Sequence, residues 1–285
     1  MNILVTGASG QLGHDLVIEL AARGHHVTGV SSKECNLTDP AAIHSCLTAL
    51  RPDAVMHCAG YTAVDQAEDD AERCDRINRA GTEALARACA ELGSKLLFIS
   101  TDYVFPGDGL RPWEPDDQPE PLNVYGMSKY RGEEAVHRYV EKHFIVRISW
   151  LFGLNGKNFV KTMLRLGAER EQLTVVNDQI GSPTYTKDLS VLLADMIVTE
   201  RYGTYHATNE GFCSWYEFAC AIMAEAGLPA RVLPVSSDQY PSRAKRPANS
   251  RMSKDKLTQN GFDRLPPWQD ALRRYLAELK ENDNG

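Results

Sequence analysis

The chain has 285 residues, of which 43% are apolar, and a formal net charge of −7. This length predicts one large α/β domain, or a nucleotide-binding domain with a smaller domain attached. The acidic balance, without any basic run, argues against nucleic acid and an anionic membrane as partners.

Buried-strand patterns alternate with amphipathic helical patterns over the first half of the chain. We expect strands at residues 2–6, 26–30, 53–58, 95–100 and 144–150. We expect helices at residues 12–23, 40–50, 78–92 and 125–141. Strands that alternate with helices of this length form βαβ units, so the pattern predicts a Rossmann-type, doubly wound parallel sheet.

The pattern loosens after Gly153. Helices are expected at 159–170, 186–199, 215–225 and 267–279, with short strands near 174–177, 204–207 and 231–235. We interpret this part as a smaller C-terminal α/β lobe that binds substrate. The expected division is a dinucleotide-binding domain at 1–153 and mainly substrate lobe at 154–285, with the chain returning to the first domain around 186–200.

A glycine-rich turn follows the first strand. Gly7, Gly10 and Gly13 form G-x-x-G-x-x-G, which differs from the more common G-x-G-x-x-G. Glycines allow a tight turn and a close approach of the backbone to a pyrophosphate, and the next helix offers free N–H groups and the positive end of its dipole. The turn therefore predicts a dinucleotide site.

The end of the second strand bears on the choice between NAD and NADP. A carboxylate there would bind the ribose 2′-hydroxyl, but the chain continues from Val30 as Ser-Ser-Lys33-Glu34. Lys33 could contact a 2′-phosphate, or it could be an exposed loop lysine. We expect NADPH as the cofactor, with NADH tolerated because Glu34 lies close by.

A tyrosine and a lysine stand four residues apart at the start of a predicted helix. Tyr125 and Lys129 lie on one helix face, and a cation there is expected to lower the pKa of the phenol. Such a phenol can give a proton to a ketone oxygen. Thr101 ends a sheet strand, where its hydroxyl could polarise the same oxygen.

Eight segments taken together resemble the dTDP-4-dehydrorhamnose reductase family, within the extended short-chain dehydrogenases. They are GASGQLG (7–13), CAGYTAVD (58–65), STDYVF (100–105), PLNVYGMSK (121–129), RISW (147–150), NFVKTM (158–163), DQIGSPT (178–184) and RPANS (246–250). The resemblance covers nearly the whole chain. It implies NAD(P)H-dependent reduction of dTDP-4-dehydro-β-L-rhamnose, the last step of dTDP-L-rhamnose synthesis.

The resemblance also implies roles for individual residues. Thr101, Tyr125 and Lys129 would be catalytic. The cofactor would contact Gly7, Gly10, Gln11, Leu12, Asn36, Leu37, Gly60, Tyr61, Thr62, Tyr125 and Lys129. The substrate would contact Thr101, Asp102, Tyr103, Tyr125, Trp150, Asn158 and Arg246. Trp150 could instead pack between the lobes, and Arg246 could be a surface arginine.

Some members of the family bind Mg²⁺ through carboxylates at a dimer interface. Asp15, Asp188 and Glu278 fall near the corresponding places, but two of them are Asp where Glu is expected. We therefore predict no metal. Hydride transfer polarised by Thr and Tyr does not require one.

Four other functions share this scaffold. A 4,6-dehydratase would need an Asp-Glu pair beside the threonine, whereas Asp102 is followed by Tyr103. A nucleotide-sugar 4-epimerase or a different 4-keto reductase fits the motifs less well but is not excluded by them. A non-catalytic NADP-binding regulatory subunit would be expected to lose the catalytic residues, and all three are present.

Cysteine content and the N-terminus bear on location. The seven cysteines include no C-x-x-C pair, which favours a reduced compartment over a disulfide framework. The N-terminus lacks the basic region of a signal peptide, and no apolar run reaches bilayer-spanning length. We expect a cytoplasmic monomer or homodimer that binds a nucleotide sugar.

Overall fold

The structure is a computed structural model that describes residues 1–240 and 242–283. Within these residues, six strands form one parallel sheet in the order β10-β5-β4-β3-β1-β2. The strands are β1 (Asn2–Thr6), β2 (His26–Val30), β3 (Ala54–His57), β4 (Lys95–Thr101), β5 (His143–Ile148) and β10 (Gly203–His206). The expected α/β fold with a parallel sheet is confirmed.

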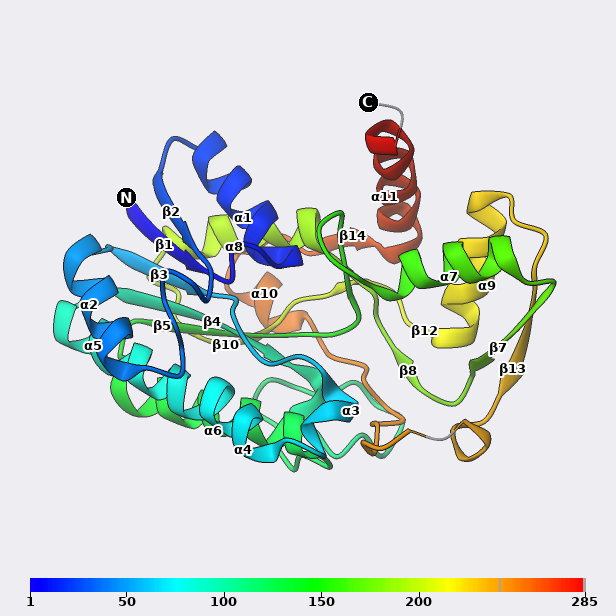
Figure 1. Cartoon of the computed structure of the whole chain (residues 1–285), viewed down its shortest axis with the longest axis horizontal. Coiled ribbons are helices and arrows are strands. Elements are labelled where there is room, and N and C mark those ends of the chain that lie inside the picture. Colours follow the sequence, from blue (N-terminus) through cyan, green and yellow to red (C-terminus); the bar gives the residue numbers. More distant parts are fainter. Residues whose placement is uncertain (241, 284–285) are drawn as a thin grey trace.

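Helices cover both faces of the sheet (Figure 1). They are α1 (Gln11–Ala22), α8 (Thr186–Ile197) and α10 (Asp255–Gln259) on one face, and α2 (Pro40–Leu50), α5 (Thr82–Leu92) and α6 (Val124–Tyr139) on the other. Successive side chains of a strand point to opposite faces, so Ile3 and Val5 pack with α1 and α8, whereas Leu4 packs with α2 and α5. The long apolar strands are therefore buried on both sides.

The connection between β3 and α5 holds three short elements that the sequence pattern did not indicate. They are α3 (Val64–Ala67), α4 (Ala71–Asp75) and a π-helical turn, η1 (Arg76–Gly81). The helix expected from residue 78 thus continues a helical path that starts further upstream. Because η1 follows α4 directly, it places the side chains that precede α5 beside the carboxyl ends of the strands.

A second group of elements surrounds its own apolar core. It comprises β6 (Leu151–Phe152), α7 (Phe159–Glu169), β7 (Gln172–Val176), β8 (Ile180–Gly181), β9 (Thr184–Tyr185), β12 (Cys213–Ser214), α9 (Trp215–Ala226), β13 (Arg231–Val235) and α11 (Trp268–Asp283). The aromatic rings of Phe152, Tyr185 and Tyr275 pack together in this core. In Figure 1, α7, α9, β7 and β13 lie at the far side from the main sheet.

The chain passes between the two groups more than once. Helix α8 packs on α1, and β10 then pairs in parallel with β5 at the edge of the main sheet, although the pattern grouped residues 204–207 with the C-terminal lobe. The remaining elements are η2 (Asp102–Val104), η3 (Ser237–Gln239), β11 (Asn209–Glu210) and β14 (Leu265–Pro267). None of the helices within 1–240 and 242–283 is long and apolar enough to cross a membrane.

Candidate active site

A cavity of about 1020 Å³ opens at the carboxyl ends of β1, β3, β4 and β5. In an open parallel sheet this edge is where ligands bind. The predicted site residues that line it are Gly7, Gly10, Gln11, Leu12, Asn36, Leu37, Gly60, Thr62, Thr101, Asp102, Tyr103, Tyr125, Lys129 and Trp150. The structure thus brings the predicted cofactor turn and the predicted catalytic residues into one space.

The glycine turn is packed so closely that side chains do not fit. Gly7 has a φ of +71°, and a Cβ there would lie 2.8 Å from the backbone N of Ala59. A Cβ on Gly13 would lie 2.2 Å from the carbonyl oxygen of Gly7. Helix α1 begins directly after Gly10, so its free N–H groups face the cavity as a phosphate site requires. These features fit a dinucleotide.

The loop after β3 is held from behind by a buried asparagine. The Tyr61 N–H donates to Asn78 Oδ1 (2.8 Å), and Asn78 Nδ2 donates to the Tyr61 carbonyl (3.0 Å). Asn78 Nδ2 also donates to Ser128 Oγ (3.0 Å), on the helix that carries Tyr125. Asn78 therefore couples the loop after β3 to the helix that carries Tyr125, and the motifs alone did not single it out.

Helix α6 presents Tyr125 and Lys129 to the cavity together. Asn123 caps the helix by accepting from the Gly126 N–H (2.8 Å), which fixes where the first turn starts. Gly126 lies so close to the Tyr103 carbonyl oxygen that a Cβ there would be only 2.2 Å from it. The rings of Tyr103 and Tyr125 meet edge to face, with centroids 5.6 Å apart. The phenol is thereby held against the end of β4.

Burial dominates the ionisation of this pair in the structure. It raises the pKa of Tyr125 above its ordinary value, and an interaction with the Thr101 hydroxyl offsets only part of that effect. Burial also lowers the pKa of Lys129 to about 8. The expectation that Lys129 lowers the pKa of the phenol is therefore not met here. At neutral pH Tyr125 keeps its proton, as a proton donor must.

Asp102 is a buried carboxylate beside the predicted catalytic threonine. It accepts hydrogen bonds from Thr101 Oγ1 (3.0 Å) and from Ser250 Oγ. Burial nevertheless raises the pKa of Asp102 to about 6. It is the one carboxylate among the described residues that line the cavity.

This raised pKa predicts a pH-dependent gain in stability for Asp102→Asn. The carboxyl ionises near pH 3.8 in the unfolded state and near pH 6 in the folded state. Between these values the unfolded state ionises more readily, so the free energy of unfolding falls as the pH rises, and the loss is complete above about pH 6. At about pH 7.5 we expect Asp102→Asn to have a higher free energy of unfolding than wild type, by on the order of 1–3 kcal/mol. This difference should shrink as the pH falls toward about 5. Urea unfolding measures it, with the exposed Asp116→Asn as the control; a gain that grows on acidification would contradict the assignment.

Two tryptophans form a stacked pair at the cavity wall. Trp150 and Trp215 have ring centroids 3.7 Å apart and both line the cavity. Trp150 has a φ of +49°, an uncommon backbone conformation for a bulky residue. The sequence suggested Trp150 but not Trp215, because the two are 65 positions apart and meet only through the fold.

Three predicted residues are not among those that line the cavity. Tyr61 contributes its backbone to the loop held by Asn78. Asn158 caps α7 and donates to Gln11 Oε1 (3.1 Å) and Tyr275 Oη (3.2 Å). Arg246 bridges Tyr103 Oη and Asp65, at 2.8 Å each. All three lie one contact away from cavity residues, so direct ligand contact stays a prediction for them.

A loop from the second lobe lies over the glycine turn. Asn155 Nδ2 donates to the carbonyls of Ser9 (2.8 Å) and Gly10 (3.2 Å). Gly156 and Lys157, which follow it, line the cavity. Sequence motifs could not reveal this, because the loop carries no pattern and meets the turn across about half of the chain.

Comparison with known proteins agrees with this geometry. A family model described as RmlD substrate binding domain matches residues 1–281. The dTDP-4-dehydrorhamnose reductase of Escherichia coli K12 is 40% identical over 293 aligned positions, with 98% of each chain covered. The spore coat polysaccharide biosynthesis protein SpsK of Bacillus subtilis is 41% identical, with 97% of each chain covered.

A solved structure of dTDP-4-dehydrorhamnose reductase from Bacillus anthracis, in complex with NADP, superposes with a TM-score of 0.95. It is 44% identical and the match covers 97% of this chain and 98% of that one. The chain belongs to the dTDP-4-dehydrorhamnose reductase family. The resemblance drawn from the eight sequence segments is thus confirmed.

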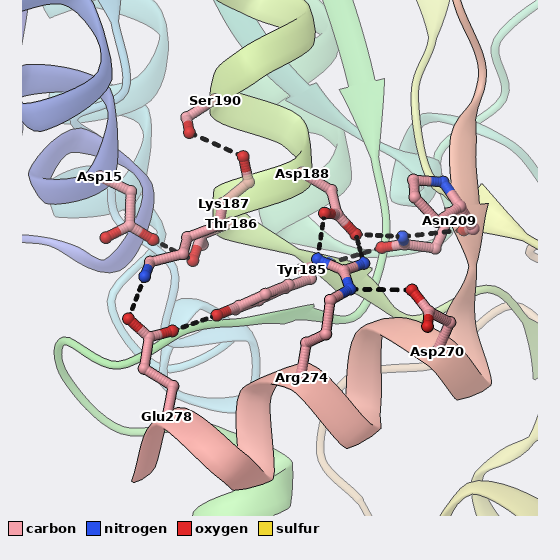
Figure 2. A network of polar contacts seen from close by, with 11 residues as sticks. Asp15, Tyr185, Thr186, Lys187, Asp188, Ser190, Asn209, Asp270, Arg274 and Glu278 are labelled. Carbon is pink, nitrogen blue, oxygen red and sulfur yellow. Dashed lines mark hydrogen bonds and ion pairs between the residues drawn. The ribbon is translucent and has the colours of Figure 1, made fainter. Parts of the chain in front are cut away.

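The magnesium that some members of this family bind does not fit the carboxylates of this chain. Figure 2 shows the three acidic residues already engaged by other side chains. Asp15 accepts from Thr186 Oγ1, and Glu278 accepts from Tyr185 Oη and pairs with Lys187 Nζ. Within 1–240 and 242–283, no group of three or more metal-ligating side chains is placed to hold an ion.

The third carboxylate is held by an arginine. Both Nη atoms of Arg274 donate to Asp188, at 2.7 Å each, and Asn209 Nδ2 donates to it at 2.7 Å (Figure 2). Arg274 also reaches Asp270 on its own helix (2.8 Å). Arg274 and Lys187 thus supply the positive charge of this network, and Arg274 ties α11 to α8.

We expect Arg274→Met to lower the free energy of unfolding by about 1–3 kcal/mol, because the nearly buried Asp188 carboxylate would lose its bidentate partner. Arg273→Met is the control, since Arg273 is exposed and its nearest acidic group lies 3.6 Å away.

Thermal unfolding in EDTA and in MgCl₂ should give the same midpoint for wild type. A midpoint raised by several degrees in MgCl₂ would contradict the charge assignment.

Proposed function

We propose that this chain reduces dTDP-4-dehydro-β-L-rhamnose to dTDP-L-rhamnose with NADPH, the last step of dTDP-rhamnose synthesis, and that NADH is tolerated as a substitute. The observation that carries the proposal is the convergence of Thr101, Tyr125 and Lys129 in the cavity that also contains the glycine turn. The relatives named dTDP-4-dehydrorhamnose reductase, about 40% identical over nearly the full length, support the choice of sugar.

The residues that would hold NADPH are those of the glycine turn, the segment after β2 and the loop after β3. Gly7, Gly10 and the N-terminus of α1 suit its pyrophosphate, and Lys129 suits the ribose next to the nicotinamide. When bound, this cofactor supplies the hydride for the sugar carbonyl carbon. The remaining requirements, a proton for the oxygen and its polarisation, are met by side chains of this chain.

Tyr125 donates its phenolic proton to the ketone oxygen of the sugar as the C–H bond forms, which leaves an alcohol on the sugar and a phenolate on the enzyme. When the substrate binds, the Thr101 hydroxyl turns its single hydrogen from Asp102 to the same ketone oxygen and stabilises the developing charge there. The Lys129 ammonium stabilises the phenolate until solvent returns the proton. Thr101 and Lys129 are themselves buried, so a bound sugar would leave little water between them and the ketone, which would strengthen these interactions.

Sugar contacts are assigned to Asp102, Tyr103 and Trp150, with Asn158 and Arg246 behind them. Asp102 and Tyr103 follow Thr101 directly, so a ketone at Thr101 would bring the neighbouring hydroxyls to these side chains. The Trp150–Trp215 pair offers an apolar surface to the sugar ring. We place the enzyme in the cytoplasm, as a monomer or homodimer, in agreement with its free cysteines.

The direct test is NADPH oxidation by the purified protein with enzymatically made dTDP-4-dehydro-β-L-rhamnose, followed by identification of the product. Stoichiometric formation of dTDP-L-rhamnose is expected. dTDP-glucose, which has no keto group, is the control and should leave NADPH unchanged. Interconversion of sugar epimers without net NADPH consumption would instead indicate an epimerase, and no reaction with any dTDP-4-keto sugar would contradict catalysis.

A further inference from the structure

Two arginines line the cavity without a charge partner. Arg73 lies in α4 and Arg76 begins η1, and both side chains are exposed. Neither guanidinium makes a hydrogen bond or ion pair with any residue of 1–240 or 242–283. The next arginines along the same helical path are paired, Arg79 with Asp75 and Arg87 with Glu83. The unpaired cations are thus the two that face the ligand space.

The last residue of η1, Gly81, packs against the segment that follows β2. A Cβ on Gly81, at the end of η1, would lie 2.6 Å from the Leu37 carbonyl oxygen, so this turn is pressed against residues 36–37. Asn36, Leu37 and Ile77 all line the same cavity. In doubly wound folds the end of the second strand lies beside the adenosine ribose of the cofactor. Arg76, which begins η1, lines the cavity together with these residues.

The acidic residue that could favour NADH is held by Ser31 and does not itself line the cavity. The Glu34 carboxylate accepts from the Ser31 N–H (2.8 Å) and from Ser31 Oγ (2.6 Å). Glu34 is not among the residues that line the cavity, and neither is Lys33, the lysine that the sequence suggested. Ser31 and Ser32 do line it. The groups that line the cavity after β2 are therefore small hydroxyl side chains, and the unpaired guanidinium groups of Arg73 and Arg76 line the same cavity.

We propose that Arg76, supported by Arg73 three residues before it, binds the 2′-phosphate of NADPH and sets the preference for NADPH over NADH. The inference rests on the proposed function, because it assumes a nicotinamide cofactor in this cavity. A planar guanidinium suits a phosphate because it donates parallel hydrogen bonds to two oxygens. NADH carries only a hydroxyl at that position, so it gains little from either arginine.

The test is to measure the dissociation constants of NADPH and NADH for wild type, Arg76→Gln, the double variant Arg73→Gln/Arg76→Gln and Arg87→Gln, by titration calorimetry without sugar. We expect Arg76→Gln to weaken NADPH by about tenfold or more, equivalent to about 1.4 kcal/mol. NADH should change by less than about twofold. The double variant should lose more NADPH affinity still. Arg87→Gln removes the same charge from α5 outside the cavity and should bind both cofactors as wild type does.

Two results would overturn the assignment: an unchanged NADPH affinity in Arg76→Gln, or an equal loss for both cofactors, which would indicate contact with a group common to both. Neither result touches the reductase proposal, which depends on turnover of the sugar. Conversely, a wild type that prefers NADPH through Arg76 but fails to reduce the sugar would refute only the proposed reaction. Wild type that binds neither cofactor would contradict both.

Discussion

Tyr125→Phe is expected to lower kcat by about 10²–10⁴-fold while the NADPH dissociation constant stays within about threefold of wild type. The substitution removes only the hydroxyl to which we assign proton donation. The ring keeps its edge-to-face contact with Tyr103, and α6 keeps its Asn123 cap. Because proton donation acts in the transition state, the loss should appear in kcat and kcat/KM together.

Single-turnover NADPH oxidation with the keto sugar measures this effect without interference from product release. Tyr139→Phe is the matched control, since Tyr139 ends the same helix and its hydroxyl contacts Glu83 on the protein surface. Its kcat should equal that of wild type. If Tyr125→Phe retained a rate within about threefold of wild type, another group would have to protonate the ketone, and the proton-donor role would be withdrawn.

The parallel sheet could be predicted because its determinants are local. Residues 3–6 form a continuous apolar or β-branched run, and residues 26–30 contain three β-branched side chains. Pro40 follows the Asp39 cap at the start of α2, and all three elements match their predicted bounds. Tyr125 and Lys129 could be paired because a helix repeats every 3.6 residues. The glycine turn could be assigned because close backbone packing excludes any side chain there.

The rest of the site depends on contacts between distant segments. Asn155 reaches the glycine turn from the second lobe. Asn78 links Tyr61, which precedes it in the sequence, to Ser128, which follows it. Arg73 and Arg76 are placed by α4 and η1, whose short length gives no periodic pattern to detect. No local rule indicates which of several exposed arginines will face a cavity.

Ionisation was the other property that sequence spacing misjudged. Four-residue spacing places Lys129 beside Tyr125, but it does not report how deeply the fold buries both groups. Burial disfavours the charged form of each, so the pKa of Tyr125 is raised and that of Lys129 falls to about 8. The charged forms of both groups are therefore costly where the fold buries them.

Gly13→Ala is expected to reduce NADPH affinity by about tenfold or more and to lower the free energy of unfolding by about 1–3 kcal/mol. The added Cβ would lie 2.2 Å from the carbonyl oxygen and 2.7 Å from the carbonyl carbon of Gly7. Both are backbone atoms, so the contact can be relieved only if α1 or the turn moves. Such a shift displaces the N–H groups that face the pyrophosphate.

Gly24→Ala separates this effect from the general cost of replacing a glycine. Gly24 has a φ of +79°, so Ala is strained there, but a Cβ at that position meets no atom of the described residues within 4 Å. It should therefore cost about 1 kcal/mol of stability and leave NADPH binding unchanged. If Gly13→Ala lost about 1–3 kcal/mol of stability, as expected, yet bound NADPH like wild type, the turn would not bind the pyrophosphate, because its backbone could move without any effect on cofactor affinity.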